Sequence, residues 1–118
     1  MKRNHRSLKA WQQAIQLVEH VYSLTAVFPK EELFGLSSQM RRAAVSVPAN
    51  IAEGAARSGS KELLRFLSIA TASLSELDTH VEIARRLGYL KDNALELEMD
   101  SVSALIMGLM ASVRKKLD

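Results

Sequence analysis

The side chains that most often carry chemistry in proteins are sparse in this sequence. It contains no cysteine and only three histidines, His5, His20 and His80, which lie far apart. His80 follows Glu76 by four residues, so the two share a helical face, but we expect the apolar stripe of that helix to lie elsewhere. A carboxylate-bridged metal pair in a helical bundle needs Glu-x-x-His on two helices, and the sequence has none.

A second pair, Glu53 and Arg57, offers an acid beside a base. At a spacing of four residues in a helix, the ordinary outcome is an intrahelical ion pair. The sequence also lacks a glycine-rich phosphate loop, a His-Glu-x-x-His zinc motif and a serine nucleophile elbow. We therefore expect a protein that is not an enzyme, with no catalytic residue, no metal site and no cofactor.

The elements that must position any binding residues are helices. Apolar residues at spacings of three and four predict four helices and no strand, over about residues 7–26, 35–57, 60–87 and 92–117. Five Gly and two Pro in 118 residues leave turn chemistry for only a few long elements. Short connections favour antiparallel neighbours, so the sequence predicts one all-α domain, residues 1–118, folded as an antiparallel up-down-up-down four-helix bundle.

Particular residues mark the predicted helix ends. Ser7, Ser60 and Asp92 are suitable N-caps for the first, third and fourth helices, and Gly88 suits the position just after the third. Pro48 falls inside the second helix, where it removes a backbone hydrogen bond, so we expect a kink or a local break there.

Each helix carries an apolar stripe that should form the core. In the first helix the stripe is Leu8, Trp11, Ile15, Val18 and Tyr22. In the third helix Leu67, Leu74 and Leu77 lie on one side, and we expect all three in the core together with Phe66. The second helix contributes Leu36, Met40, Ala43, Val47 and Ile51.

The second helix has a further, alanine-rich face, Val45, Ala49, Ala52 and Ala56. A bundle helix needs only one apolar face, so this one either faces solvent or packs against another copy of the chain as an oligomer interface. A polar stripe lies beside it and consists of Gln39, Arg42, Ser46, Asn50 and Glu53. This structural polar stripe is either partly buried, where it would fix the register of packing, or a solvated surface.

The second helix also carries a recognisable pattern. It is Gln39-x-Arg41-Arg42-Ala43-x-x-Ser46 followed by Asn50-Ile51-Ala52-Glu53-Gly54. Over about Leu8 to Leu90 the sequence resembles the four-helix-bundle proteins encoded in intervening sequences of bacterial large-subunit (23S) ribosomal RNA genes. It is also similar to the accessory variability protein of diversity-generating retroelements, which assists a reverse transcriptase.

The resemblance implies a ring-like homopentamer without known catalytic activity. It also implies association with nucleic acid or with a reverse transcriptase for some relatives. The sequence departs from the family pattern at Ala72, where glycine is usual, and at Asp78, where glutamate is usual.

The charge is unevenly distributed along the chain. The net charge of +3 is too small to identify a nucleic-acid binder by itself. In an up-down-up-down bundle, however, the start of the first helix, the end of the second, the start of the third and the end of the fourth meet at one end. We call this the basic end, and its cations are Lys2, Arg3, Arg6, Lys9, Arg57, Lys61, Arg65, Arg114, Lys115 and Lys116.

Only Glu53, Glu62 and Asp118 oppose these ten cations, which leaves ten minus three, or +7. The basic end is therefore the candidate nucleic-acid-binding surface, for RNA or DNA, with Arg41 and Arg42 as the next candidates; the alternative is that these cations serve solubility. A protein-binding oligomeric scaffold with no nucleic-acid role is the alternative function. The partner of such a scaffold would be a reverse transcriptase or another protein.

The sequence also gives an expectation about location. No run of about 18 apolar residues occurs, and the basic N-terminal residues lead into an amphipathic stretch rather than a signal-peptide core. We therefore expect a cytoplasmic protein that makes no use of a membrane.

Overall fold

The computed structural model describes residues 1–117, which form four α-helices and contain no strand. The helices are α1 (Lys9–Thr25), α2 (Leu36–Ala56), α3 (Ser60–Arg86) and α4 (Ala94–Leu117). Two short 3-10 helices, η1 (Asn4–Ser7) and η2 (Lys30–Glu32), precede α1 and α2. The all-α prediction with four helices is confirmed. Asp118, which we counted among the acidic residues of the basic end, lies outside the described residues.

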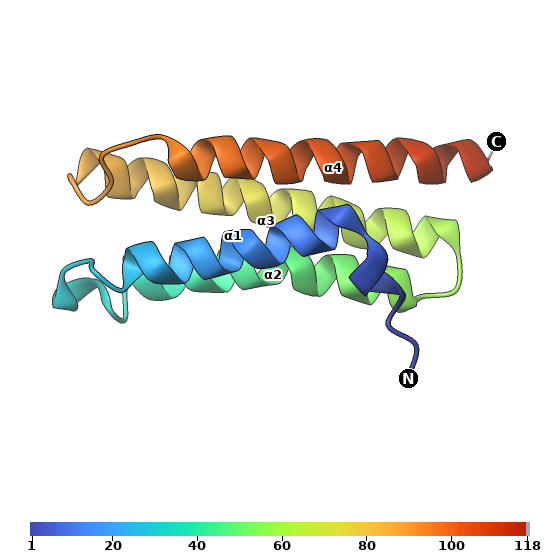
Figure 1. Ribbon diagram of the computed structural model, residues 1–118, viewed down its shortest axis with the longest axis horizontal. Coiled ribbons are helices and arrows are strands. Elements are labelled where there is room, and N and C mark those ends of the chain that lie inside the picture. Colours follow the sequence, from blue (N-terminus) through green and yellow to red (C-terminus); the bar gives the residue numbers. More distant parts are fainter. Residues whose placement is uncertain (118) are drawn as a thin grey trace.

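The helices form an elongated bundle. In Figure 1, α1 and α3 run toward the left and α2 and α4 run toward the right. Each helix packs against its neighbours in the sequence, and α4 also packs against α1. The principal extents are 48, 27 and 19 Å, so the two ends of the bundle are separate surfaces. Within residues 1–117, no helix combines the length and apolar character that crossing a membrane requires.

The ends of α3 and α4 follow the sequence signals. Gly88 has φ of 85°, and its N–H donates to Arg85 O at 3.0 Å, while Tyr89 N–H donates to Ala84 O at 2.9 Å. This pair of bonds is a Schellman motif, which confirms Gly88 as the residue after the helix. At the start of α4, the Asp92 carboxylate accepts a hydrogen bond from Ala94 N–H at 3.1 Å.

The other two N-cap predictions were wrong. Ser7 ends η1, and its hydroxyl donates to Asn4 O at 3.0 Å, so α1 begins two residues later without a side-chain cap. Ser60 is already the first residue of α3, and Gly59, with φ of 140°, occupies the cap position.

Pro48 is buried inside α2, which continues through it as an unbroken helix from Leu36 to Ala56.

The core confirms the predicted stripes of α2 and α3 and corrects that of α1. Leu67, Leu74 and Leu77 are buried, as are all five residues of the α2 stripe. In α1, however, the buried residues are Ala10, Ala14, Leu17, Val21 and Thr25. The two alanines allow α1 to approach its neighbours closely, so the larger Leu8, Trp11 and Val18 pack at the edges of the core. Tyr22 remains 44% exposed.

Candidate nucleic-acid interface

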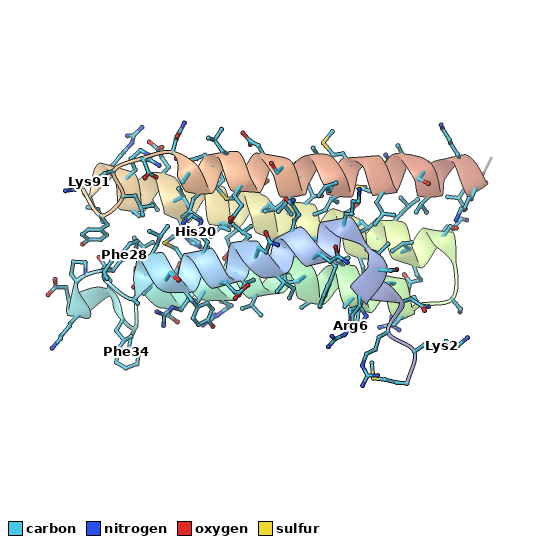
Figure 2. All side chains as sticks on the ribbon, in the orientation of Figure 1. Lys2, Arg6, His20, Phe28, Phe34 and Lys91 are labelled. Carbon is cyan, nitrogen blue, oxygen red and sulfur yellow. The ribbon has the colours of Figure 1, made fainter. Side chains whose placement is uncertain are left out.

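The predicted basic end draws on four parts of the chain. Figure 1 draws the N-terminus, the α2–α3 connection and the C-terminal end of α4 toward the same end of the bundle. All ten predicted cations are exposed. Figure 2 labels Lys2 and Arg6 toward this end, whereas Lys91 lies at the opposite end.

Two arginines of the basic end form ion pairs with Glu53 and Glu62, the acidic residues of this end that the structure describes. Arg57 Nη2 lies 3.6 Å from Glu53 Oε2, and Arg65 Nε donates to Glu62 Oε2 at 2.8 Å. The guanidinium carbons of both arginines also lie near the Phe66 ring, at 5.2 Å and 4.6 Å from its centroid. Phe66 is buried, as predicted, so its ring does not offer a stacking platform for a base.

The N-terminal turn is held against the start of α1. The Arg6 guanidinium carbon lies 5.7 Å from the Trp11 ring centroid, and the His5 ring makes an edge contact with Trp11 at 5.1 Å between centroids. Gln12 Nε2 donates to Arg6 O at 2.8 Å. These contacts place Arg6 at the surface in a defined position. Within residues 1–117, eight of the ten cations have no ion pair, since only Arg57 and Arg65 do.

The alanine-rich face of α2 is partly covered by the chain itself. Val45, Ala49 and Ala56 are exposed, whereas Ala52 is half-buried. Met1, Lys2 and His5 line a shallow pocket together with Ala49, Ala52, Glu53 and Ala56. Sequence reasoning missed this cover, because no apolar period before Leu8 indicates where the first residues lie. Val45 does not line this pocket.

The polar stripe of α2 divides into a half-buried middle and exposed ends. Ser46 Oγ and Ser73 Oγ share a hydrogen bond of 2.8 Å that joins α2 to α3. Asn50 Nδ2 donates to Ser46 O at 2.8 Å and to Ser46 Oγ at 3.0 Å. These residues are half-buried, whereas Gln39, Arg42 and Glu53 are exposed. The stripe therefore tethers two helices at its centre and faces outward at its ends.

The histidines do not come together. His80 Nε2 lies 3.2 Å from Glu76 Oε2, and His20 Nδ1 lies 3.4 Å from Glu98 Oε2. His80 is only 8% exposed, which corrects our placement of it away from the core: it follows Leu77 by three residues and shares the buried side of α3. Within residues 1–117, no group of three or more histidine and carboxylate side chains is arranged to hold a metal ion.

The fold and the surface define a class, that of small four-helix-bundle proteins with many exposed cations. The family model of the 23S rRNA-intervening sequence protein matches residues 6–108, which is most of the chain. The chain therefore belongs to that family, as the resemblance over about Leu8 to Leu90 indicated. A comparison with curated proteins finds no match.

Proposed function

We propose that this chain is a non-enzymatic, oligomeric accessory protein that binds nucleic acid through phosphate contacts at its basic end. One observation carries the proposal: eight exposed cations have no ion pair within residues 1–117, while Glu53 and Glu62 are each bound to an arginine. The proposal assumes the up-down-up-down order of helices and a cytoplasmic setting. Membership of a family named for insertions in ribosomal RNA genes is consistent with it.

The expected mode of binding is electrostatic. Each phosphate that a lysine or arginine neutralises releases counterions, so affinity falls steeply as salt rises. Contacts to phosphates do not read sequence. The rings of Phe66 and Trp11 are packed against arginines, so base stacking contributes little. We therefore expect similar affinity for unrelated sequences.

The test removes three cations from the end of α4, with Arg114, Lys115 and Lys116 replaced by glutamine. Affinity for a duplex should fall, and the slope of log K against log salt should become shallower by up to about 2.7, or about 0.9 for each lost contact. A control removes cations from the opposite end of the bundle, at Arg86 and Lys91. The control should keep most of the slope, because the local phosphate contacts and not the net charge determine it.

The opposite result would assign binding elsewhere. If the affinity for nucleic acid is unchanged by the three glutamine substitutions and also by deletion of residues 1–6, the basic end is not the binding surface. Arg41 and Arg42 would then be the residues to change.

Oligomerisation is the second element of the proposal. Light scattering at micromolar concentration should report several times the 13.1 kDa of one chain, and the family resemblance implies five copies. Ala49→Glu should split the assembly if the alanine-rich face is the interface, since a charge would be buried there. A monodisperse monomer of the natural sequence would refute oligomerisation.

A protein-binding scaffold without a nucleic-acid role is the second candidate. It is supported by the apolar side chains exposed near the α1–α2 connection, above all Phe34 at 93% exposure. Tyr22, Leu33 and Val45 line a groove with Phe34 of about 420 Å³. The partner would be a reverse transcriptase or another protein. Absence of nucleic-acid binding even at low salt would favour this scaffold over the nucleic-acid-binding protein.

A further inference from the structure

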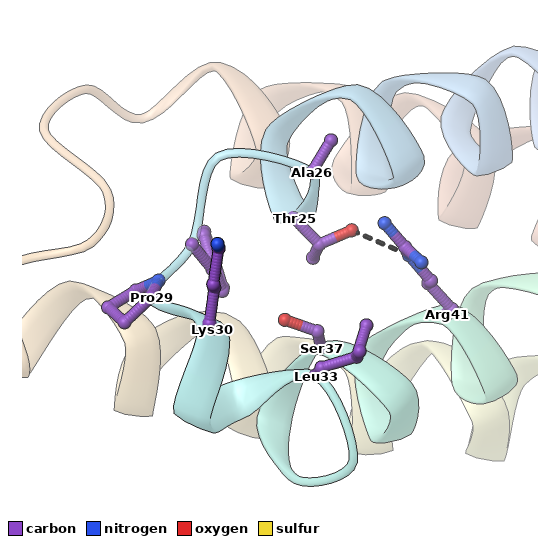
Figure 3. Close-up of a pocket in the computed structure, with 8 residues that line it drawn as sticks. Thr25, Ala26, Pro29, Lys30, Leu33, Ser37 and Arg41 are labelled. Carbon is purple, nitrogen blue, oxygen red and sulfur yellow. Dashed lines mark hydrogen bonds between the residues drawn. The ribbon is translucent and has the colours of Figure 1, made fainter.

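A separate cavity lies at the opposite end of the bundle, between the end of α1, the η2 turn and the first turn of α2 (Figure 3). Its volume is about 300 Å³. Thr25, Lys30, Ser37 and Arg41 form the polar part of its wall, and Phe28 and Leu33 belong to the apolar part. Among the residues that line it there is no carboxylate.

Ser37 is the unusual residue of this cavity. It is 1% exposed, and its hydroxyl has no hydrogen-bond partner within the described chain. Figure 3 shows the Ser37 oxygen directed into the cavity, between Lys30 and Arg41. A buried hydroxyl without a partner lowers stability, and a ligand that accepts a hydrogen bond from Ser37 Oγ would remove this cost.

Arg41 is held in position for the same ligand. Its Nε donates to Thr25 Oγ1 at 2.8 Å, and its guanidinium carbon lies 4.6 Å from the ring centroid of Tyr22. These contacts fix the side chain while its two terminal nitrogens have no hydrogen bond or ion pair to the described residues. A fixed guanidinium with free N–H groups matches the geometry of an oxyanion.

The first turn of α2 adds a third source of positive potential. Ser37 is the second residue of this helix, where backbone N–H groups have no acceptor inside the helix and the helix dipole favours an anion. The Glu32 carboxylate already balances part of this potential, because it accepts a hydrogen bond from Leu36 N–H at 3.2 Å; it also accepts one from the Tyr89 hydroxyl at 3.0 Å. It is not among the residues that line the cavity.

We propose that this cavity binds a phosphate monoester, with its phosphate between Lys30, Ser37 and Arg41 and its apolar body against Phe28 and Leu33. Two cations, a hydroxyl donor and a helix N-terminus suit a dianionic group better than a single negative charge. The site lies away from the basic end, so it does not depend on the function proposed above. Its natural ligand is a small phosphate monoester or the terminal phosphate of a nucleic acid, which share this chemistry.

Phenyl phosphate and inorganic phosphate are the probes for a direct test. Titration calorimetry should show binding of phenyl phosphate, with weaker binding of inorganic phosphate because it lacks the apolar body. Ser37→Ala should weaken phenyl phosphate binding by about tenfold or more, the effect expected for a lost hydrogen bond to a charged group. Lys30→Gln should weaken it as well. The matched control is Ser38→Ala, which removes a hydroxyl one residue away that does not line the cavity.

Thermal unfolding supplies an independent readout. Without ligand, Ser37→Ala should leave Tm unchanged or raise it, because it removes an unpartnered hydroxyl; with ligand, it should lose the stabilisation that the natural protein gains. A marked fall in Tm without ligand would show that the hydroxyl has a structural partner. That result, or equal affinity of the Ser37→Ala and natural proteins for phenyl phosphate, or no binding of either probe, overturns the proposal.

Two oligonucleotides distinguish the sources of the phosphate. Binding of one sequence with a 5′-phosphate and with a 5′-hydroxyl is compared in the variant that lacks the three cations of α4. A preference for the 5′-phosphate that Ser37→Ala abolishes assigns the site to nucleic-acid ends. Equal binding of the two strands, with phenyl phosphate still bound, assigns it to small phosphate monoesters.

Discussion

Gly54 closes the sequence pattern of α2, and α3 packs closely against its backbone. A Cβ at this position would lie 2.9 Å from Phe66 Cβ, 3.1 Å from Leu63 Cδ1 and 3.3 Å from Leu63 O. The first and last of these atoms belong to or adjoin the α3 backbone, so they move only if the helix moves. We therefore expect Gly54→Ala to force the start of α3 away from α2.

The expected magnitude follows from two opposing effects. Overpacking of a close contact costs about 1–3 kcal/mol, and the rigid neighbours here place the cost in the upper part of that range. Alanine recovers about 1 kcal/mol of helix propensity relative to glycine. The net effect of Gly54→Ala should be a loss of about 1–2 kcal/mol, or about 4–8 °C in Tm for a domain of this size.

Gly108 supplies the matched control, because it undergoes the same substitution inside a helix. A Cβ there would meet no atom within 4 Å, so Gly108→Ala should gain about 1 kcal/mol from propensity alone. The two variants are compared by calorimetry at several protein concentrations, since the proposed assembly would make Tm depend on concentration. An equal rise in Tm for both variants would refute the close approach of α2 and α3 at Gly54.

Three further predictions concern the core and the polar contacts of the bundle. Leu67→Ala should cost about 2–5 kcal/mol in chemical denaturation, because the side chain is fully buried; a cost below about 1 kcal/mol would place it outside the core. The side chains of Arg85 and Glu96 make two parallel hydrogen bonds of 3.0 and 2.7 Å. A double-mutant cycle with glutamine at both sites should therefore give a coupling free energy of about 1 kcal/mol that falls with salt. Zero coupling at low salt would contradict this. The hydrogen bond from the Tyr89 hydroxyl to Glu32, with burial and the nearby carboxylates, raises the pKa of Tyr89 above 10.0. Because this folded-state pKa exceeds the unfolded one, the stability from the protonated phenol is present below the unfolded pKa and is lost as pH rises through the folded pKa. Tyr89→Phe should remove that loss of stability in alkaline denaturation. An unchanged dependence of stability on pH would contradict the assignment.

The sequence predicted the candidate surface less completely than it predicted the fold. The ten cations were identified from the expected order of helices, and all of them are exposed. The contacts of Arg57 and Arg65 with the Phe66 ring, and the cover that Met1 and His5 give to the alanine-rich face, were not predicted. These contacts join side chains whose distance in space depends on helix ends and turns, which a local period does not describe.

The amino-acid sequence by itself determined four helices and the buried stripes of α2 and α3. Runs of large apolar residues at spacings of three and four leave only one side of each helix suitable for burial. It also determined the Schellman motif at Gly88, because a left-handed residue after a helix favours glycine.

The tertiary structure alone decided which side of α1 is buried and what surrounds Ser37. In α1, large apolar residues occupy positions next to small ones, and the close approach of neighbouring helices selects the line through Ala10, Ala14 and Leu17 over the line through Tyr22. The cavity at Ser37 exists because the end of α1 and the η2 turn meet the first turn of α2 there. Both outcomes depend on distances between helices, and hydrophobic periodicity within one helix carries no information about those distances.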